Sequence, residues 1–164
     1  MNLILRNKHL SWNHLIFPCA WGYGGIRNSK QEGDGVTPFG CFPFRRVFYR
    51  ADRIEKPDTS LPLKPLTPQD GWCDDPNDPL YNQYITLPYE ASHEELWRKD
   101  HLYDIILVVG YNDDPIVKGK GSAIFVHLSS SSYDPTAGCV AFALPHLLTV
   151  LKEASAQSNL VIQN

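Results

Sequence analysis

The stretch "GSAIFVHLSSSSYDPTAGCVAF", residues 121–142, combines an apolar run, a polar loop and a turn that ends at a cysteine. Residues 121–128 are rich in β-branched and aromatic side chains, which predicts a buried strand with His127 near its end. A serine-rich loop follows, and Pro135 then turns the chain before Cys139 begins a second apolar segment. Because such a strand, loop and turn can bring its two ends side by side, we expect Cys139 to lie near His127.

A cysteine beside a histidine suits nucleophilic catalysis. A free thiol has a pKa of about 8.5, and a neighbouring imidazole lowers it by stabilising the thiolate. The imidazolium can then protonate a leaving amine. Gly138 would let a substrate approach the backbone closely, and the N–H groups of Gly138 and Cys139 would then serve as oxyanion donors. The same residues also fit an inert buried thiol and an ordinary core histidine.

Strand patterns dominate the rest of the chain. β-Branched and aromatic runs predict strands at residues 3–6, 14–20, 44–50, 84–89, 103–111 and 159–163. Residues 51–82 are rich in proline and aspartate and have no obvious elements, which is typical of a functional loop or lid.

Two helices are predicted. Residues 92–100 begin with Ser92 as N-cap and have Glu95 three positions later, the pattern of a capping box. Residues 144–154 carry Pro145 in the first turn and leucines at the spacing of an amphipathic helix. The whole chain therefore reads as a mostly β protein with two short helices and a long loop insertion.

Length and charge restrict the function classes. The 164 residues suggest one domain, residues 1–164, and the net charge of −3 with no basic cluster speaks against a nucleic-acid partner. No apolar run reaches about 18 residues, so no transmembrane segment is expected. The apolar pieces near the N-terminus are short and interrupted by polar residues, which makes a poor signal peptide.

The four cysteines, Cys19, Cys41, Cys73 and Cys139, have wide and irregular spacings and form no C-x-x-C motif. A structural zinc site is therefore not expected. The sequence permits one disulfide among the first three. A zinc hydrolase that uses His127, Cys139 and His146 is a remote alternative.

Three motifs in order, "DGVTPFGCF" (34–42), "GKGSAIFVH" (119–127) and "TAGCVAF" (136–142), resemble the L,D-transpeptidase catalytic domain of the YkuD type. The resemblance spans residues 14–152. It implies a mostly β sandwich or barrel, and it implies neither a cofactor nor a metal.

By this resemblance Cys139 is the nucleophile, His127 is the general base and acid, and Thr136 and Gly138 complete the motif. Two positions depart from the family pattern. Ala137 stands where relatives have a histidine, and Ala141 stands where many have a polar or basic residue. Since those side chains orient or bind substrate in many relatives, we expect the donor or acceptor specificity to differ here.

Further residues are candidates for substrate binding, together with Thr136 and Ala137. Arg98 would hold a stem-peptide carboxylate through two parallel hydrogen bonds. Trp72 and Tyr81, from the insertion, would line the apolar part of the stem. The alternatives are a salt bridge from Arg98 to Asp100 or Glu94, and a packing role for the two aromatic residues.

The resemblance implies chemistry on peptidoglycan stem peptides, which would act as donor and acceptor. Cys139 would attack the carbonyl of an L-centre that precedes a D-residue, and the thioester would pass to an amine, giving a 3–3 or a 1–3 cross-link. A hydrolase working through the same acyl-enzyme is the first alternative, and a non-catalytic peptidoglycan-binding module is the second. Such a substrate implies the periplasm or the cell surface. The sequence does not indicate an oligomeric state.

Overall fold

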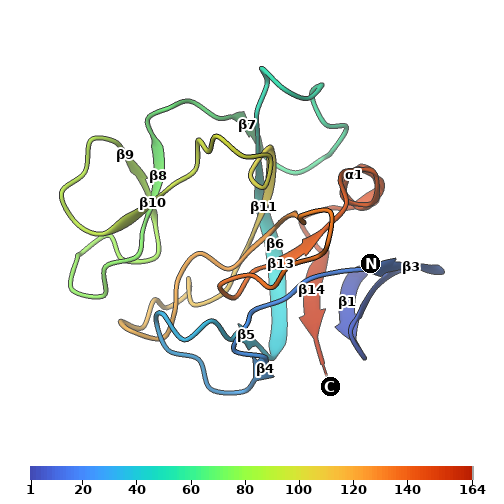
Figure 1. Ribbon diagram of the computed structural model, residues 1–164, viewed down its shortest axis with the longest axis horizontal. Coiled ribbons are helices and arrows are strands. Elements are labelled where there is room, and N and C mark those ends of the chain that lie inside the picture. Colours follow the sequence, from blue (N-terminus) through green and yellow to red (C-terminus); the bar gives the residue numbers. More distant parts are fainter. Residues whose placement is uncertain (164) are drawn as a thin grey trace.

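The computed structural model describes residues 1–163, which fold around one large mixed sheet (Figure 1). Its strands run in the order β13–β12–β11–β6–β14–β1–β2–β3, and β7 pairs with β6 beside this path. The bounds of these strands are β1 (Asn2–Arg6), β2 (His9–Trp12), β3 (Leu15–Pro18), β6 (Gly40–Tyr49), β7 (Leu63–Pro65), β11 (Ile105–Val109), β12 (Phe125–Leu128), β13 (Val140–Phe142) and β14 (Asn159–Ile162).

Three smaller elements accompany the large sheet. A second sheet has the order β10–β8–β9, and a third consists of two short parallel strands, β4 and β5. The single helix, α1 (Leu144–Glu153), follows β13 directly. The bounds of the remaining strands are β4 (Ile26–Arg27), β5 (Thr37–Pro38), β8 (Asp70–Cys73), β9 (Tyr84–Thr86) and β10 (His93–Glu95).

The long strand β6 joins the two halves of the large sheet. Its first residues pair with β14, where Cys41 lies opposite Val161. Its later residues pair with β11, where Val47 lies opposite Leu107. One continuous strand therefore holds β14 and β1 in a fixed position relative to β11 and β12. His127 lies on β12, and Cys139 directly precedes β13.

Strands β11, β12 and β13 are buried on both faces. Because side chains alternate along a strand, neighbouring residues enter different cores. Leu107, Val126 and Val140 belong to the larger apolar cluster, whereas Phe125 and Cys139 belong to a smaller one on the other face.

Different elements cover these two faces. The larger cluster includes the apolar side of α1, with Leu147, Val150 and Leu151. The smaller cluster includes Leu66 and Leu96, with Trp72 of β8 packed against it. In Figure 1 the sheet β8–β9–β10 stands apart from α1, on the other side of β11. The face that carries Cys139 is therefore covered by segments that flank and include the insertion.

Two structural predictions are wrong. Residues 92–100 form no helix, because residues 93–95 pair with β8 as strand β10. The Ser92 hydroxyl donates to the Asp74 carboxylate (2.6 Å) and caps no helix. The segment 51–82 is also not devoid of elements, since it contains β7 and β8. In both places pairing with distant strands decided the local structure, which a local pattern does not reveal.

Other predictions are confirmed. The fold is mostly β, α1 begins and ends within one residue of the predicted helix, and the strand predictions at 3–6, 44–50, 103–111 and 159–163 overlap β1, β6, β11 and β14. Two further observations concern points that the sequence left open or gave only as absences. All four cysteines are free thiols. No helix among residues 1–163 has the length and apolar character that crossing a membrane requires.

Candidate active site

The pairing of β12 with β13 brings His127 and Cys139 to the same face of the large sheet. The two strands are parallel, with Val126 opposite Val140 and His127 opposite Ala141. Cys139 therefore lies beside Phe125, whose N–H donates to the Cys139 Sγ (3.3 Å). Side chains two residues apart on a strand share a face. The thiol and the imidazole accordingly line one cavity of about 230 Å³ rather than opposite sides of the sheet.

The turn before Cys139 is braced by the upstream T-P-x-G motif. Gly138 has φ of +135°, and a Cβ there would lie 2.9 Å from the Val36 carbonyl oxygen, so only glycine fits. The fully buried Thr37 donates its hydroxyl hydrogen to the Gly138 carbonyl (2.7 Å) and accepts the Gly22 N–H (2.8 Å). This bond connects two of the sequence motifs, although they lie about a hundred positions apart in the chain.

Thr136 holds the inside of the same turn. Its hydroxyl donates to the Cys139 carbonyl and accepts the Gly138 N–H (3.1 Å). The Gly138 N–H that was expected to stabilise an oxyanion is thus engaged within the turn. Its use as an oxyanion donor remains a prediction, and it would require exchanging this bond for one to substrate.

The Cys139 thiol is buried, with 8% of the residue exposed. It donates to the Ala123 carbonyl (3.1 Å). Burial raises the pKa of Cys139 to about 12, and the charge of Glu94 acts in the same direction. The Phe125 N–H and the charge of Lys30 lower the pKa, but by less than burial raises it.

His127 is also buried and is held in one tautomer. Its Nδ1 lies 2.9 Å from the Leu128 carbonyl oxygen. Because a carbonyl only accepts, Nδ1 carries the hydrogen and Nε2 keeps its lone pair. Burial lowers the pKa of His127 to about 4, so the ring is neutral near pH 7. The expectation that the imidazole lowers the thiol pKa is corrected here: burial dominates, and both groups are neutral in the free protein.

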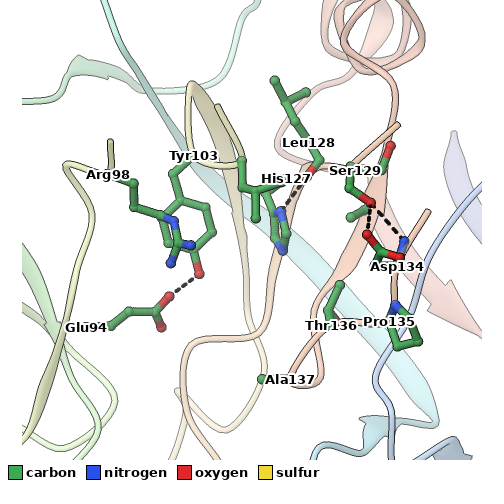
Figure 2. A pocket seen from close by; sticks show the side chains of 13 residues that line it. Glu94, Arg98, Tyr103, His127, Leu128, Ser129, Asp134, Pro135, Thr136 and Ala137 are labelled. Carbon is green, nitrogen blue, oxygen red and sulfur yellow. Dashed lines mark hydrogen bonds between the residues drawn. The ribbon is translucent and has the colours of Figure 1, made fainter. Parts of the chain in front are cut away.

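A second cavity, of about 320 Å³, has the lining residues drawn in Figure 2 and shares His127 with the first. Thr136, Ala137 and Arg98, the residues proposed from the sequence to contact substrate, line this cavity, and their contact with a substrate stays a prediction. The Arg98 guanidinium also makes two hydrogen bonds to Asp100 (2.9 and 2.6 Å). The salt-bridge alternative for Arg98 is therefore observed, and its binding of a stem carboxylate stays a prediction.

Glu94 and Tyr103 line both cavities and were missed from the sequence. The Tyr103 hydroxyl donates to the Glu94 carboxylate, and the Tyr103 ring meets that of His127 edge-on with 5.1 Å between centroids. Burial raises the pKa of the Glu94 carboxyl. The sequence did contain a signal for Glu94. It lies two positions before the fully buried Leu96, and residues two apart on a strand share a face, so a strand here places Glu94 on the inner face.

Trp72 and Tyr81 line neither cavity, which corrects their predicted substrate contact. The Trp72 indole lies edge-on to Phe125 (5.2 Å between centroids) and donates to the Asn82 side chain (3.0 Å). The same Asn82 oxygen accepts the Ala123 N–H (3.0 Å), next to the carbonyl that holds the thiol. Trp72 therefore supports the site from behind.

Tyr81 has a similar structural role. It is 1% exposed, and its hydroxyl donates to Glu32 (3.1 Å) while accepting the Gly121 N–H (3.0 Å). From the same part of the insertion, Asp74 does line the cavity that contains Cys139. The insertion thus reaches the site through a carboxylate rather than through its aromatic residues.

The set proposed for a zinc site is not brought together. Within residues 1–163, no three His, Cys, Asp or Glu side chains are arranged to hold a metal ion. His146 instead stacks on Phe17, with 4.5 Å between ring centroids.

Comparison with known protein families agrees with the fold. The model of the L,D-transpeptidase catalytic domain (YkuD) matches residues 3–162, which is nearly the whole chain. No individual curated protein matches with significance. The chain belongs to the L,D-transpeptidase catalytic domain family.

Proposed function

We propose that this protein is an acyl-transfer enzyme that acts on peptidoglycan stem peptides through a thioester on Cys139. The observation that carries the proposal is the shared cavity of Cys139 and His127, in which Nδ1 is bound to a backbone carbonyl and Nε2 is left as a base. Family membership supports the reaction class and the substrate class.

The neutral state of the pair favours a base-assisted attack. The Cys139 thiol gives its proton to Nε2 of His127 while Sγ forms a bond to the carbonyl carbon of an L-centre. The tetrahedral intermediate collapses as the D-residue amine leaves, and the imidazolium returns the proton to that amine. An acceptor amine then attacks the thioester carbonyl and gives a proton to Nε2 of His127. The bond between the carbonyl carbon and Sγ breaks, Sγ takes that proton to restore the Cys139 thiol, and the new amide bond is the cross-link.

Two cavities that meet at the base suit a reaction with two substrates. One cavity is lined by Cys139 and the other by Arg98. The Arg98 guanidinium can bind a stem carboxylate if its hydrogen bonds are divided between that carboxylate and Asp100. Ala137 and Ala141 leave the second cavity without the side chains that the family pattern has there. A 1–3 linkage is therefore as compatible with this site as a 3–3 linkage.

Peptidoglycan lies outside the cytoplasmic membrane, so we infer that the protein works in the periplasm or at the cell surface. The test is to incubate the purified protein with muropeptides, with and without an added amine acceptor, and to identify the products by mass. Cross-linked dimers or acceptor exchange support acyl transfer, and their linkage type distinguishes 3–3 from 1–3. Trimmed stems alone would indicate a hydrolase.

A control variant separates chemistry from folding in this test. Cys19 is a second free thiol with the same exposed fraction as Cys139, 8%, and lines neither of the two cavities at His127. Cys19→Ala should keep the full product pattern, whereas Cys139→Ala should give none. Products from Cys139→Ala would contradict the proposal.

A further inference from the structure

Lys30 is a buried cation beside the nucleophile that none of the sequence motifs accounts for. Its side chain is 3% exposed, although lysine is rarely buried without a function or a partner. It lines the same cavity as Cys139, whereas its ion-pair partner Asp34 does not. The positive end of the pair therefore faces the thiol.

Two glycines make room for this lysine. A Cβ on Gly121 would lie 2.6 Å from Lys30 Cε, and a Cβ on Gly138 would lie 3.4 Å from Lys30 Nζ. Gly138 immediately precedes the nucleophile. The ammonium therefore lies near the turn that presents Cys139, in space that a side chain at position 121 or 138 would contact.

The ammonium keeps hydrogen-bonding capacity for the cavity. It has three N–H donors, and among residues 1–163 its hydrogen-bond partner is Asp34 Oδ1 (2.9 Å). Asp34 is itself fixed by the N–H groups of Gln31 (2.7 Å) and Val36 (2.9 Å). The loop consequently has anchors that do not depend on the lysine.

We propose that Lys30 supplies the positive charge that stabilises the thiolate of Cys139 when it loses its proton. The inference rests on Cys139 being the nucleophile of the proposed function. When the S–H bond breaks and the proton moves to His127, a negative charge remains on Sγ in a buried site, where a nearby ammonium has a large effect.

The other charges around Cys139 make such a group necessary. Besides Lys30, the ionisable groups that share the cavity of Cys139 are Tyr23, Glu32, Asp74, Glu94, Tyr103 and His127. The three carboxylates oppose a thiolate, and the imidazole is neutral near pH 7 because burial lowers its pKa to about 4. Lys30 is therefore the cation that faces the sulfur in this cavity, and its charge lowers the pKa of Cys139.

The test is the pH dependence of alkylation by iodoacetamide, an uncharged reagent that reacts with the thiolate. Rates at Cys139 and at the exposed Cys41 are measured in one sample by mass spectrometry of the peptides, so Cys41 serves as an internal reference. Lys30→Gln and Lys30→Met should each slow alkylation of Cys139 about tenfold between pH 7 and 10, which corresponds to a pKa raised by about one unit. The rate at Cys41 should stay constant.

Matched variants distinguish charge from folding. Lys64→Met removes another lysine that is paired with an aspartate (2.6 Å) but lines neither cavity, and it should leave the Cys139 profile unchanged. Asp34→Asn keeps the ammonium and should not slow alkylation of Cys139. Lys30→Gln retains a donor for Asp34, so it decides the matter if the methionine variant fails to fold.

The inference is overturned if folded Lys30→Gln alkylates at the wild-type rate, or if Asp34→Asn slows Cys139 as much as Lys30→Gln does. Alkylation needs no stem peptide. Failure of the proposed function, seen as an absence of muropeptide products in wild type, is therefore distinct from failure of this inference.

Discussion

The two faces of β12 and β13 are equally buried but differ completely in chemistry. On one face Val126, Val140 and Phe142 are fully buried in an apolar core that α1 closes. On the other face His127 and Cys139 are nearly as buried, at 6% and 8% exposed, yet they line cavities. Burial alone therefore does not distinguish a core residue from a catalytic one in this molecule.

The difference lies in what covers each face. An amphipathic helix fills the space against its face with branched apolar side chains. The face with the candidate site is covered by the small sheet β8–β9–β10 and its flanking loops, which contribute Asp74, Glu94 and Arg98. Because polar loops cover this face, charged side chains line its cavities. These charges shift the pKa values of His127 and Cys139 beneath them.

Replacing the nucleophile should separate activity from stability most sharply. Cys139→Ala removes the thiol and should abolish muropeptide turnover. It should change the free energy of unfolding by about 1 kcal/mol or less, because a thiol and a methyl group have similar volumes. Product analysis and denaturant unfolding of the same preparation provide the measurement. Retained turnover would contradict the mechanism.

Replacing the base should reduce turnover by about 10²-fold or more, since both removal of the thiol proton and protonation of the leaving amine are assigned to His127. His127→Gln keeps a hydrogen-bonding side chain of similar size. Steady-state kinetics on wild type and variant give the ratio. A ratio near one, in a variant that is fully folded, would remove His127 from the mechanism.

Replacing Trp72, which packs behind the site, should reduce stability more than activity. Trp72→Ala removes a large side chain packed against Phe125 and leaves Asn82 without one donor, so it should cost about 3–5 kcal/mol in the free energy of unfolding. Arg98→Ala should cost little stability, because its ion pair with Asp100 is partly exposed, but should lower turnover.

Thermal unfolding measured beside turnover per folded molecule compares these two variants directly. Trp72→Ala should keep much of its specific activity at a temperature where it is folded. A Trp72→Ala protein with unchanged stability and altered products would restore this residue to the substrate site.

The buried imidazole should make the protein sensitive to acid. The pKa of His127 is lowered to about 4 from its usual value of 6.5, so between these values the unfolded state binds more protons than the folded state. Stability should therefore fall as pH drops from 6.5 towards 4, by about 3 kcal/mol from this residue. His127→Gln should lose that part of the dependence. Identical pH profiles for the two proteins in denaturant unfolding would contradict the buried neutral state.

Much of the fold was available from local patterns. Runs of β-branched and aromatic residues identified β1, β6, β11 and β14, and leucine spacing with Pro145 identified α1, because the signal for each of these elements lies within its own residues. The nucleophile and base were predicted from a strand, a turn and the resemblance. The prediction of a helix at residues 92–100 was wrong, because pairing with β8 overrode the capping-box pattern.

By itself, the sequence determined the mostly β architecture, the helix after the cysteine turn, and the placement of a cysteine near a histidine at adjoining strand ends. Each follows from chemistry within a few residues or within one motif. Only the tertiary structure decided the protonation of that pair and the surroundings of the site. Desolvation, the approach of Lys30 between two glycines, and the position of Glu94 beside Tyr103 all depend on contacts between segments far apart in the chain. No local pattern encodes such contacts, because they arise when β8, β10 and the loop around Lys30 close over one face of the sheet.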